Sequence, residues 1–376
     1  MEKKLSKGIV VRILLVIAFL IFYKISLAPK SVSTPSNPSN IPEMKDILGD
    51  DQKTRLEAAR KLVERVGVEE ALEILEHSPL PHTGEGHLVV HQIGFYAYKK
   101  YGLDSILHCK DYFLFACFHG AIIEAAGDQG FEAIAKMTDK CKGSPNRYFQ
   151  CVHAAGHAIL AVWDYDNLPD ALKTCDNLYE KETAFPEALS SCHNGVFMEN
   201  LFGVHDWGTG REVKRKWLSD DLYYPCNAVG NKYQKGCWLN QAARIYQKSE
   251  GNIGKTAYIC QQIGQSQYTI WCMDNLARQI HPMTAGNISK VFEFCQTLGP
   301  GWAEQCIVVN AGSYYSVGGR DAAIEICKEV SNDTKSQCYQ NILGQIVGDT
   351  ITKQEKMAYC KKLESPYSSA CLQQVK

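Results

Sequence analysis

The stretch DAAIEICKEVSNDTKSQCYQNILGQIV, residues 321–347, has the form of a helical hairpin with a cysteine on each side of its turn. An amphipathic segment ends at Cys327, a short polar connection follows, and Cys338 opens a second amphipathic segment. Residues 256–280, TAYICQQIGQSQYTIWCMDNLARQI, repeat this form. We therefore expect pairs of antiparallel helices with a disulfide across each corner.

The 16 cysteines of this 376-residue chain follow the same pattern. Most successive units begin about 34 residues apart, which is the period of two-helix repeats. The chain has no C-x-x-C spacing, which structural zinc sites commonly use, so disulfides are favoured over zinc-bound cysteines. Pairing neighbours along the chain uses every cysteine and predicts the bridges Cys109–Cys117, Cys141–Cys151, Cys175–Cys192, Cys226–Cys237, Cys260–Cys272, Cys295–Cys306, Cys327–Cys338 and Cys360–Cys371.

In period and in its one bridge per hairpin, the chain resembles disulfide-stapled helical-repeat proteins of the tetratricopeptide-like type, over roughly residues 50–376. The signature residues of a true tetratricopeptide repeat are absent, so the resemblance concerns architecture. It implies an all-α fold, an α/α solenoid of about eight to nine two-helix repeats with one disulfide per hairpin in most of them.

A membrane helix is expected before the repeats. Residues 1–8 form a basic tail, residues 9–27 are mostly apolar, and residues 28–42 are a linker rich in Pro, Ser and Asn. Residues 9–27 can cross a bilayer as a short signal anchor, and a cleaved signal peptide is the alternative. The positive-inside rule places the N-terminus in the cytoplasm, so we expect a single-pass protein of the cell membrane with an extracytoplasmic folded part.

The repeats divide into two groups. Residues 43–201 form N-terminal, His-rich helical repeats, residues 202–225 form an insertion loop, and residues 226–376 form C-terminal, Cys-paired repeats. Insertions in solenoids often lie on the binding face. The 40 Lys plus Arg residues nearly balance the 41 Asp plus Glu residues, so the charge gives no reason to expect nucleic acid as a partner.

Histidines recur at fixed places in the first repeats. Counted from the cysteine that opens a second helix, the second position holds His119 in CFHGAIIEA and His153 in CVHAAGHAI, and the sixth holds His157. One repeat earlier, Glu85 occupies the place of this cysteine. The second and sixth positions after Glu85 hold His87 and His91. The later repeats place other residues at these positions, so the scaffold itself does not require histidine there.

These positions share one helix face, and His residues four apart can bind one metal ion together. Equivalent helices of neighbouring repeats pack about 8 to 10 Å apart, so the histidines of successive repeats can converge. One ion, or a pair of ions bridged near His119, is compatible with this pattern, and a hydrogen-bonded ladder of histidines is the structural alternative. The predicted ligands of a divalent metal, zinc or iron, are His87, His91, His119, His153, His157 and His193.

Two carboxylates are weak catalytic candidates. Glu124 and Glu199 both lie seven positions after their cysteines, about 140° around the helix from the second position. The alternative for each is a hydrogen bond to an adjacent helix. Gly120 and Gly195, three positions after their cysteines, fit a close approach of two helices better than catalysis.

The sequence thus predicts a membrane-anchored, extracytoplasmic helical-repeat protein with a His-rich metal site, and a metal-dependent hydrolase or oxygenase is the enzyme class it would suit. The layout is similar to that of helical-repeat dimetal hydroxylases of the deoxyhypusine hydroxylase kind, although their repeated His-Glu dipeptides are absent. A haem carrier is a weaker reading, because no C-x-x-C-H is present. The alternative function is a non-enzymatic solenoid whose groove binds a protein, peptide or glycan, with contacts from Trp207, Trp217, Tyr223 and Tyr224.

Overall fold

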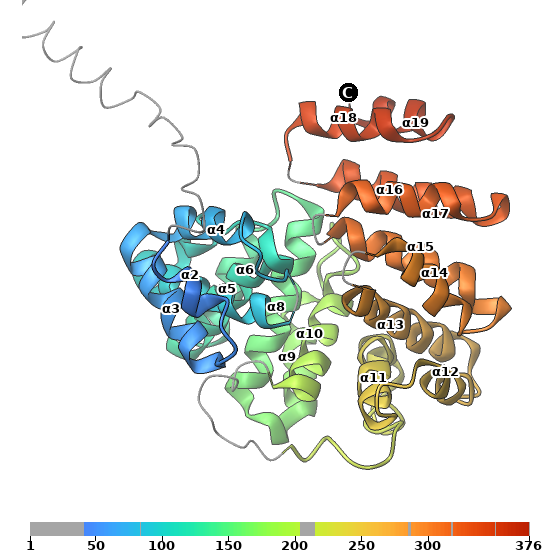
Figure 1. The fold of residues 1–376 in the computed structure, drawn as a ribbon. Coiled ribbons are helices and arrows are strands. Elements are labelled where there is room, and N and C mark those ends of the chain that lie inside the picture. Colours follow the sequence, from blue (N-terminus) through green and yellow to red (C-terminus); the bar gives the residue numbers. More distant parts are fainter. Residues whose placement is uncertain are drawn as a thin grey trace, which may run out of the picture.

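The computed structural model describes residues 41–82, 84–203, 215–284, 287–316, 319–349 and 351–375. Their regular structure is entirely helical, without a strand in any of these ranges, and this confirms the all-α prediction (Figure 1). The expected basic tail and membrane helix, residues 1–8 and 9–27, lie outside the described residues, as do most of the linker and residues 204–214 of the insertion.

Most helices follow one another with short connections, and the long segment 203–230 separates α10 from η5. Their bounds are α2 (Met44–Ile47), α3 (Gln52–Val66), α4 (Val68–Glu76), α5 (Glu85–Tyr101), η2 (Gly102–Leu107), α6 (Tyr112–Gln129), α7 (Phe131–Asp139), α8 (Pro145–Trp163), η3 (Tyr165–Asn167), α9 (Leu168–Tyr179), α10 (Ala188–Phe202), η5 (Asn231–Tyr233), α11 (Gln234–Lys248), α12 (Ile253–Gln261), α13 (Ser266–Thr284), α14 (Ile288–Gln296), α15 (Pro300–Ser316), α16 (Arg320–Glu329), α17 (Asn332–Gly348), α18 (Lys353–Lys362) and α19 (Tyr367–Val375). In the part of the chain that the structure describes, no single helix has the length and apolarity to cross a bilayer. The segments Glu85–Leu107 and Tyr112–Gln129 have that length and apolarity only when they are taken together, and they are bent by 118° relative to each other.

Local sequence signals set several helix ends. Asn252 and Asn287 cap α12 and α14, since each side chain accepts a hydrogen bond from the backbone N–H three residues later. Thr352 and Glu355 form a capping box at the start of α18. Gly203 ends α10 in the left-handed conformation, which glycine adopts without strain.

Eight disulfides bridge the corners, and their pairs are those that the cysteine spacing predicts. The bridged Cα atoms lie 5.4 to 6.5 Å apart. All sixteen cysteines are buried, so each bridge is part of the hydrophobic core. The hairpin before the first bridge has Glu85 at the equivalent place, and its carboxylate forms an ion pair with Arg55 of α3.

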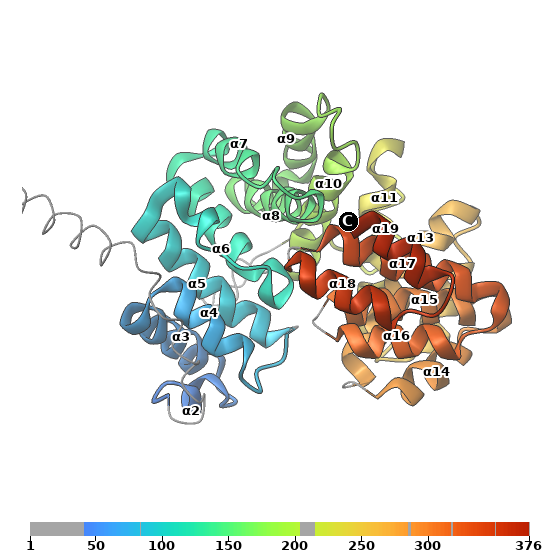
Figure 2. The same cartoon turned by 90° about the horizontal axis from the view of Figure 1, so that it is seen from above.

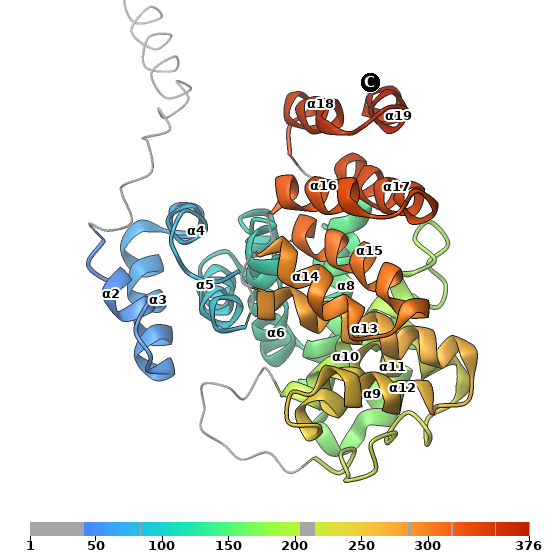
Figure 3. The same ribbon diagram turned by 45° about the vertical axis from the view of Figure 1, so that its right-hand side comes forward.

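The second helices of successive hairpins pack on one another. Contacts run from α5 to α6, α8, α10, α11, α13, α15, α17 and α19 in turn. Each first helix contacts the second helix of its own hairpin and that of the preceding hairpin; these first helices are α7, α9, α12, α14, α16 and α18. Figure 3 shows this stacking from α12 to α19. Seen from above in Figure 2, the chain follows an arc that brings α16 to α19 back towards the N-terminal helices.

Pairs of glycines bring the second helices unusually close at two crossings. An added Cβ on Gly120 of α6 would lie 2.1 Å from the carbonyl oxygen of His91, and one on Gly195 of α10 would lie 2.0 Å from that of His153. The main chains of α5 and α6 are thus in close contact, and so are those of α8 and α10. This agrees with the close approach of helices that the sequence predicts at these two glycines. Each close crossing lies beside a histidine that the sequence placed on the shared face.

Candidate metal centre

Three imidazoles from two helices converge at the α5/α6 crossing. The Nε2 atoms of His91 and His87 lie 3.0 Å apart, and His87 Nε2 lies 3.2 Å from His119 Nδ1. One nitrogen from each ring falls within 4.8 Å of the others, a spacing that could hold a metal ion. His91 and His119 are buried and His87 is half-buried. The structure therefore brings together three of the six histidines that the sequence singled out as ligands.

A main-chain carbonyl orients the first ring. His87 Nδ1 lies 2.7 Å from the carbonyl oxygen of Phe113. A carbonyl only accepts hydrogen bonds, so Nδ1 carries the proton and the Nε2 lone pair faces the other two histidines. Metal-ligating histidines are commonly held in this way through their second nitrogen.

The Phe113 carbonyl takes its position from a left-handed turn at the start of α6. Residues 113–115 have φ values of 50°, 54° and 62°, although none is glycine. Non-glycine residues pay roughly 1 to 2 kcal/mol each for this conformation. The turn lies within the Cys109–Cys117 loop, which has the smallest separation of the eight, eight residues. Because this loop is short, few residues connect η2 to α6, and the left-handed turn allows them to make the connection.

A second histidine pair continues the row on α8. The Nε2 atoms of His153 and His157 lie 3.1 Å apart. Their ring centroids lie 5.5 and 5.4 Å from that of His119. His119 thus lies between two pairs of histidines, and the five imidazoles form one continuous cluster across α5, α6 and α8.

Burial keeps three of the five rings uncharged. It lowers the pKa of His87 to about 4, because the imidazolium ion is disfavoured away from water. It also lowers the pKa of His119 and of His153 well below the ordinary value of 6.5, and the neighbouring histidines add to this effect. These rings are neutral at pH 7, which is the form that ligates metals.

Glu199 belongs to the cluster as a partner of His157. Its Oε2 atom lies 2.8 Å from His157 Nδ1, its side chain is fully buried, and the hydroxyl of Tyr165 donates to its other oxygen. A hydrogen bond to an adjacent helix is the alternative role that the sequence predicts for this residue, and the structure shows that bond. Tyr165 carried no signal in the sequence.

Glu124 lies outside the cluster. Its side chain is one-third exposed, and its Oε1 atom lies 3.5 Å from Lys99 Nζ. The structure does not bring it to any of the five histidines, so its selection as a catalytic candidate is not supported. Helical position alone grouped it with Glu199, but on the neighbouring helix α5 the carboxylate of Glu124 meets Lys99, whereas Glu199 meets a histidine.

His193 also lies apart from the five, contrary to the predicted ligand set. Its Nε2 atom lies 3.0 Å from Asp176 Oδ1, on α9. The other oxygen of Asp176 accepts hydrogen bonds from Lys232 and from Tyr233, the latter at 2.8 Å. His193 sits one position earlier than the clustered histidines, and one residue turns a side chain by about 100° around the helix. The result is a buried carboxylate that ties α9, α10 and η5 together.

Replacing Asp176 with Asn is expected to lower the free energy of unfolding by about 2 kcal/mol at pH 7, because an amide cannot accept all three hydrogen bonds. Burial raises the pKa of Asp176, but the bonds from Lys232, Tyr233 and His193 outweigh it and hold the pKa below 3.8. A depressed folded-state pKa means that the contribution is present above about pH 4 and is lost as the pH falls through that pKa.

Urea denaturation of wild type and Asp176→Asn at a series of pH values tests this expectation, and the difference between them should shrink as the medium becomes acidic. Asp170→Asn on the same helix is the matched control, because Asp170 is exposed. A difference independent of pH would show that the carboxylate charge is not what stabilises this junction.

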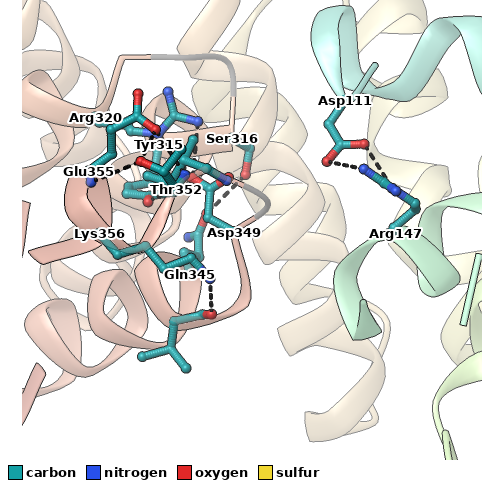
Figure 4. Close-up of polar contacts among 12 residues, drawn as sticks. Asp111, Arg147, Tyr315, Ser316, Arg320, Gln345, Asp349, Thr352, Glu355 and Lys356 are labelled. Atoms are coloured by element: carbon teal, nitrogen blue, oxygen red, sulfur yellow. Dashed lines mark hydrogen bonds and ion pairs between the residues drawn. The ribbon is translucent and has the colours of Figure 1, made fainter. Parts of the chain in front are cut away.

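A groove of about 1040 Å³ lies between the two ends of the arc, and no feature of the sequence predicts it. One wall comes from α4, α8 and the start of α6 with the segment before it, and the other comes from α15 to α18. In Figure 4, Asp111 and Arg147 pair on one side, while Arg320, Tyr315 and Asp349 are joined on the other. Phe113 lines this groove and its carbonyl holds His87, so the groove and the histidine cluster share a wall.

No protein-family model and no curated protein matches this chain. The crystal structure of Ton1535 from Thermococcus onnurineus NA1 aligns with 89% of this chain and 94% of that protein, at 12% sequence identity and a TM-score of 0.21. A TM-score this low carries no argument about fold or function. The chain's chemistry has to be inferred from its own residues.

Proposed function

We propose that this protein is a membrane-anchored, extracytoplasmic helical solenoid that binds a divalent metal ion, zinc or iron, through His87, His91 and His119. The observation that carries the proposal is the convergence of one nitrogen from each ring within 4.8 Å at the α5/α6 crossing. Neutral imidazoles suit both metals. The Phe113 carbonyl supports this role, because it fixes the His87 proton on Nδ1 and leaves Nε2 free to ligate.

Three protein ligands are the number found in catalytic sites of zinc enzymes, where a fourth position is open to water or substrate. A bound ion would supply Lewis acidity and a more acidic water molecule, so a metal-dependent hydrolase or oxygenase is the enzyme class that fits. The chain's own contribution is to orient the rings, to keep His87 and His119 neutral through burial, and to close the back of the site with the α5/α6 crossing.

The solenoid and membrane parts of the proposal rest on different features. Successive second helices pack in chain order, which supports a repeat array. Residues 9–27 are basic at their start and mostly apolar, which supports an anchor. An exported location agrees with sixteen cysteines that are all paired.

Metal content measured by elemental mass spectrometry tests the metal site. The full chain, without a His tag, is purified in its oxidised form from an exporting host, beside His87→Ala/His91→Ala. We expect this variant to lose one equivalent of zinc or iron. A matched control is His77→Ala/His108→Ala, which removes two histidines that lie outside the cluster. Unchanged metal content in the cluster variant, with the fold retained by circular dichroism, would contradict the proposal.

The groove supports a second candidate function, the binding of an extended peptide. Its wall on α17 offers the side-chain amides of Gln340, Asn341 and Gln345, groups that can pair with peptide N–H and C=O groups. Absence of metal from every variant in the experiment above would leave this groove as the functional surface. Enrichment of a displayed peptide library on wild type but not on Asn341→Ala would then identify it as a peptide site.

A further inference from the structure

We infer that His153 and His157 form a second metal site together with His119, so that the two histidine pairs hold a dinuclear centre with His119 shared between them. The inference rests on the proposed function for the first ion and adds a second ion and three further residues to the site. It is carried by the orientation of His157 on α8, by the short distance between its Nε2 atom and that of His153, and by an unsatisfied atom of His119.

One ring on α8 is held through the nitrogen that faces away from the other ring. His157 Nδ1 lies 2.8 Å from a carboxylate oxygen of Glu199, which is an acceptor. The Nε2 atom of His157 faces the Nε2 atom of His153.

Neutral rings that donate through Nδ1 carry lone pairs on Nε2. The structure places these two Nε2 atoms 3.1 Å apart. The Nε2 lone pair of His157 therefore faces the Nε2 atom of His153. A cation between the two nitrogens would be bound by both. Histidines at i and i+4 have the spacing to bind one ion together, as this pair does on α8.

His119 supplies the third nitrogen. Its Nδ1 atom lies 3.2 Å from His87 Nε2, on the side of the first site. Its Nε2 atom is buried and has no hydrogen-bond partner. A buried polar atom without a partner is costly, and here the atom belongs to a ring packed 5.5 and 5.4 Å from the centroids of His153 and His157. Coordination of a second ion would satisfy it.

Glu199 completes the arrangement as a positioning residue. It is fully buried, it holds His157 through Nδ1, and it receives the Tyr165 hydroxyl on its other oxygen. A carboxylate behind a ligating histidine raises the basicity of the ring and fixes its orientation. When both ions are bound, the ring proton of His119 leaves to solvent, because both of its nitrogens then ligate.

Zinc stoichiometry of the full chain tests the inference. The oxidised protein is stripped with chelator, exposed to Zn²⁺, freed of excess metal by gel filtration and assayed by elemental mass spectrometry. We expect two ions in wild type, one in His153→Ala/His157→Ala, one in His87→Ala/His91→Ala, and two in the His77→Ala/His108→Ala control. Circular dichroism establishes that each variant is folded.

The possible outcomes separate the two proposals. One ion in wild type that remains in His153→Ala/His157→Ala overturns the second site and leaves the proposed function standing. One ion that survives only in His87→Ala/His91→Ala overturns the proposed first site and the shared centre with it. No ion in any protein overturns both.

A milder variant keeps the inference testable if the double alanine variants do not fold. Glu199→Gln preserves the size of the side chain, and His157 keeps its ring. We expect a 10- to 100-fold weaker affinity for one of the two ions and an unchanged affinity for the other, as for other second-sphere partners of ligating histidines. Equal affinities in Glu199→Gln and wild type would overturn the positioning role and the second site with it.

Discussion

Reduction of the eight disulfides is expected to unfold the chain without added denaturant. Each bridge closes a loop of 8 to 17 residues. Loop-entropy estimates assign about 2.5 to 3 kcal/mol to a loop of this size, and thus roughly 20 kcal/mol to the eight together. Single domains are usually stable by only about 5 to 15 kcal/mol. The cysteines are buried in the core, so loss of the bridges also loosens the packing around each corner.

Far-UV circular dichroism and gel filtration before and after treatment with a phosphine reductant measure this effect, with the thiols alkylated to prevent reoxidation. The control is Cys360→Ala/Cys371→Ala, which removes only the bridge between the terminal helices α18 and α19. That variant should stay folded and lose about 2 to 3 kcal/mol. A reduced chain that kept its full helical signal would show that helix packing alone holds the repeats together.

The hairpins could be predicted from the sequence because their determinants are local. An amphipathic segment, a polar turn and a cysteine on each side of it lie within about 30 residues, and the bridge then joins neighbours along the chain. The histidine row was predictable for a related reason. The second helices pack on one another in order, so a shared position on each helix becomes a shared surface between helices.

The parts that could not be predicted depend on distances between helices. A helical wheel gives only the direction of Glu199 on α10, and it placed this residue away from the histidine face of its own helix. The structure brings α8 so close, at Gly195, that Glu199 reaches His157 of the preceding second helix instead. No side-chain pattern in the sequence marks the carbonyl of Phe113 or the groove between the chain ends. The first follows from one backbone turn, and the second follows from the arc that the helices describe.

Two glycine-to-alanine substitutions on the same helix are expected to have opposite effects. Gly120→Ala should lower the free energy of unfolding by roughly 3 kcal/mol or more, since its Cβ would lie 2.1 Å from the His91 carbonyl oxygen and 2.9 Å from the carbonyl carbon. Main-chain atoms cannot rotate away, so α5 and α6 must separate. Gly127→Ala should raise stability by about 0.5 to 1 kcal/mol, because Gly127 is exposed in α6 and its added Cβ meets nothing within 4 Å.

Urea denaturation of the two variants, combined with zinc titration, links the crossing to the site. Separation of α5 from α6 moves His87 and His91 away from His119, so Gly120→Ala should also weaken zinc binding, whereas Gly127→Ala should leave it unchanged. Gly195→Ala extends the comparison to α8 and α10, where the added Cβ would lie 2.0 Å from the His153 carbonyl oxygen. If Gly120→Ala were as stable as Gly127→Ala and bound zinc as tightly, close approach of the helices would not be what assembles the histidine cluster.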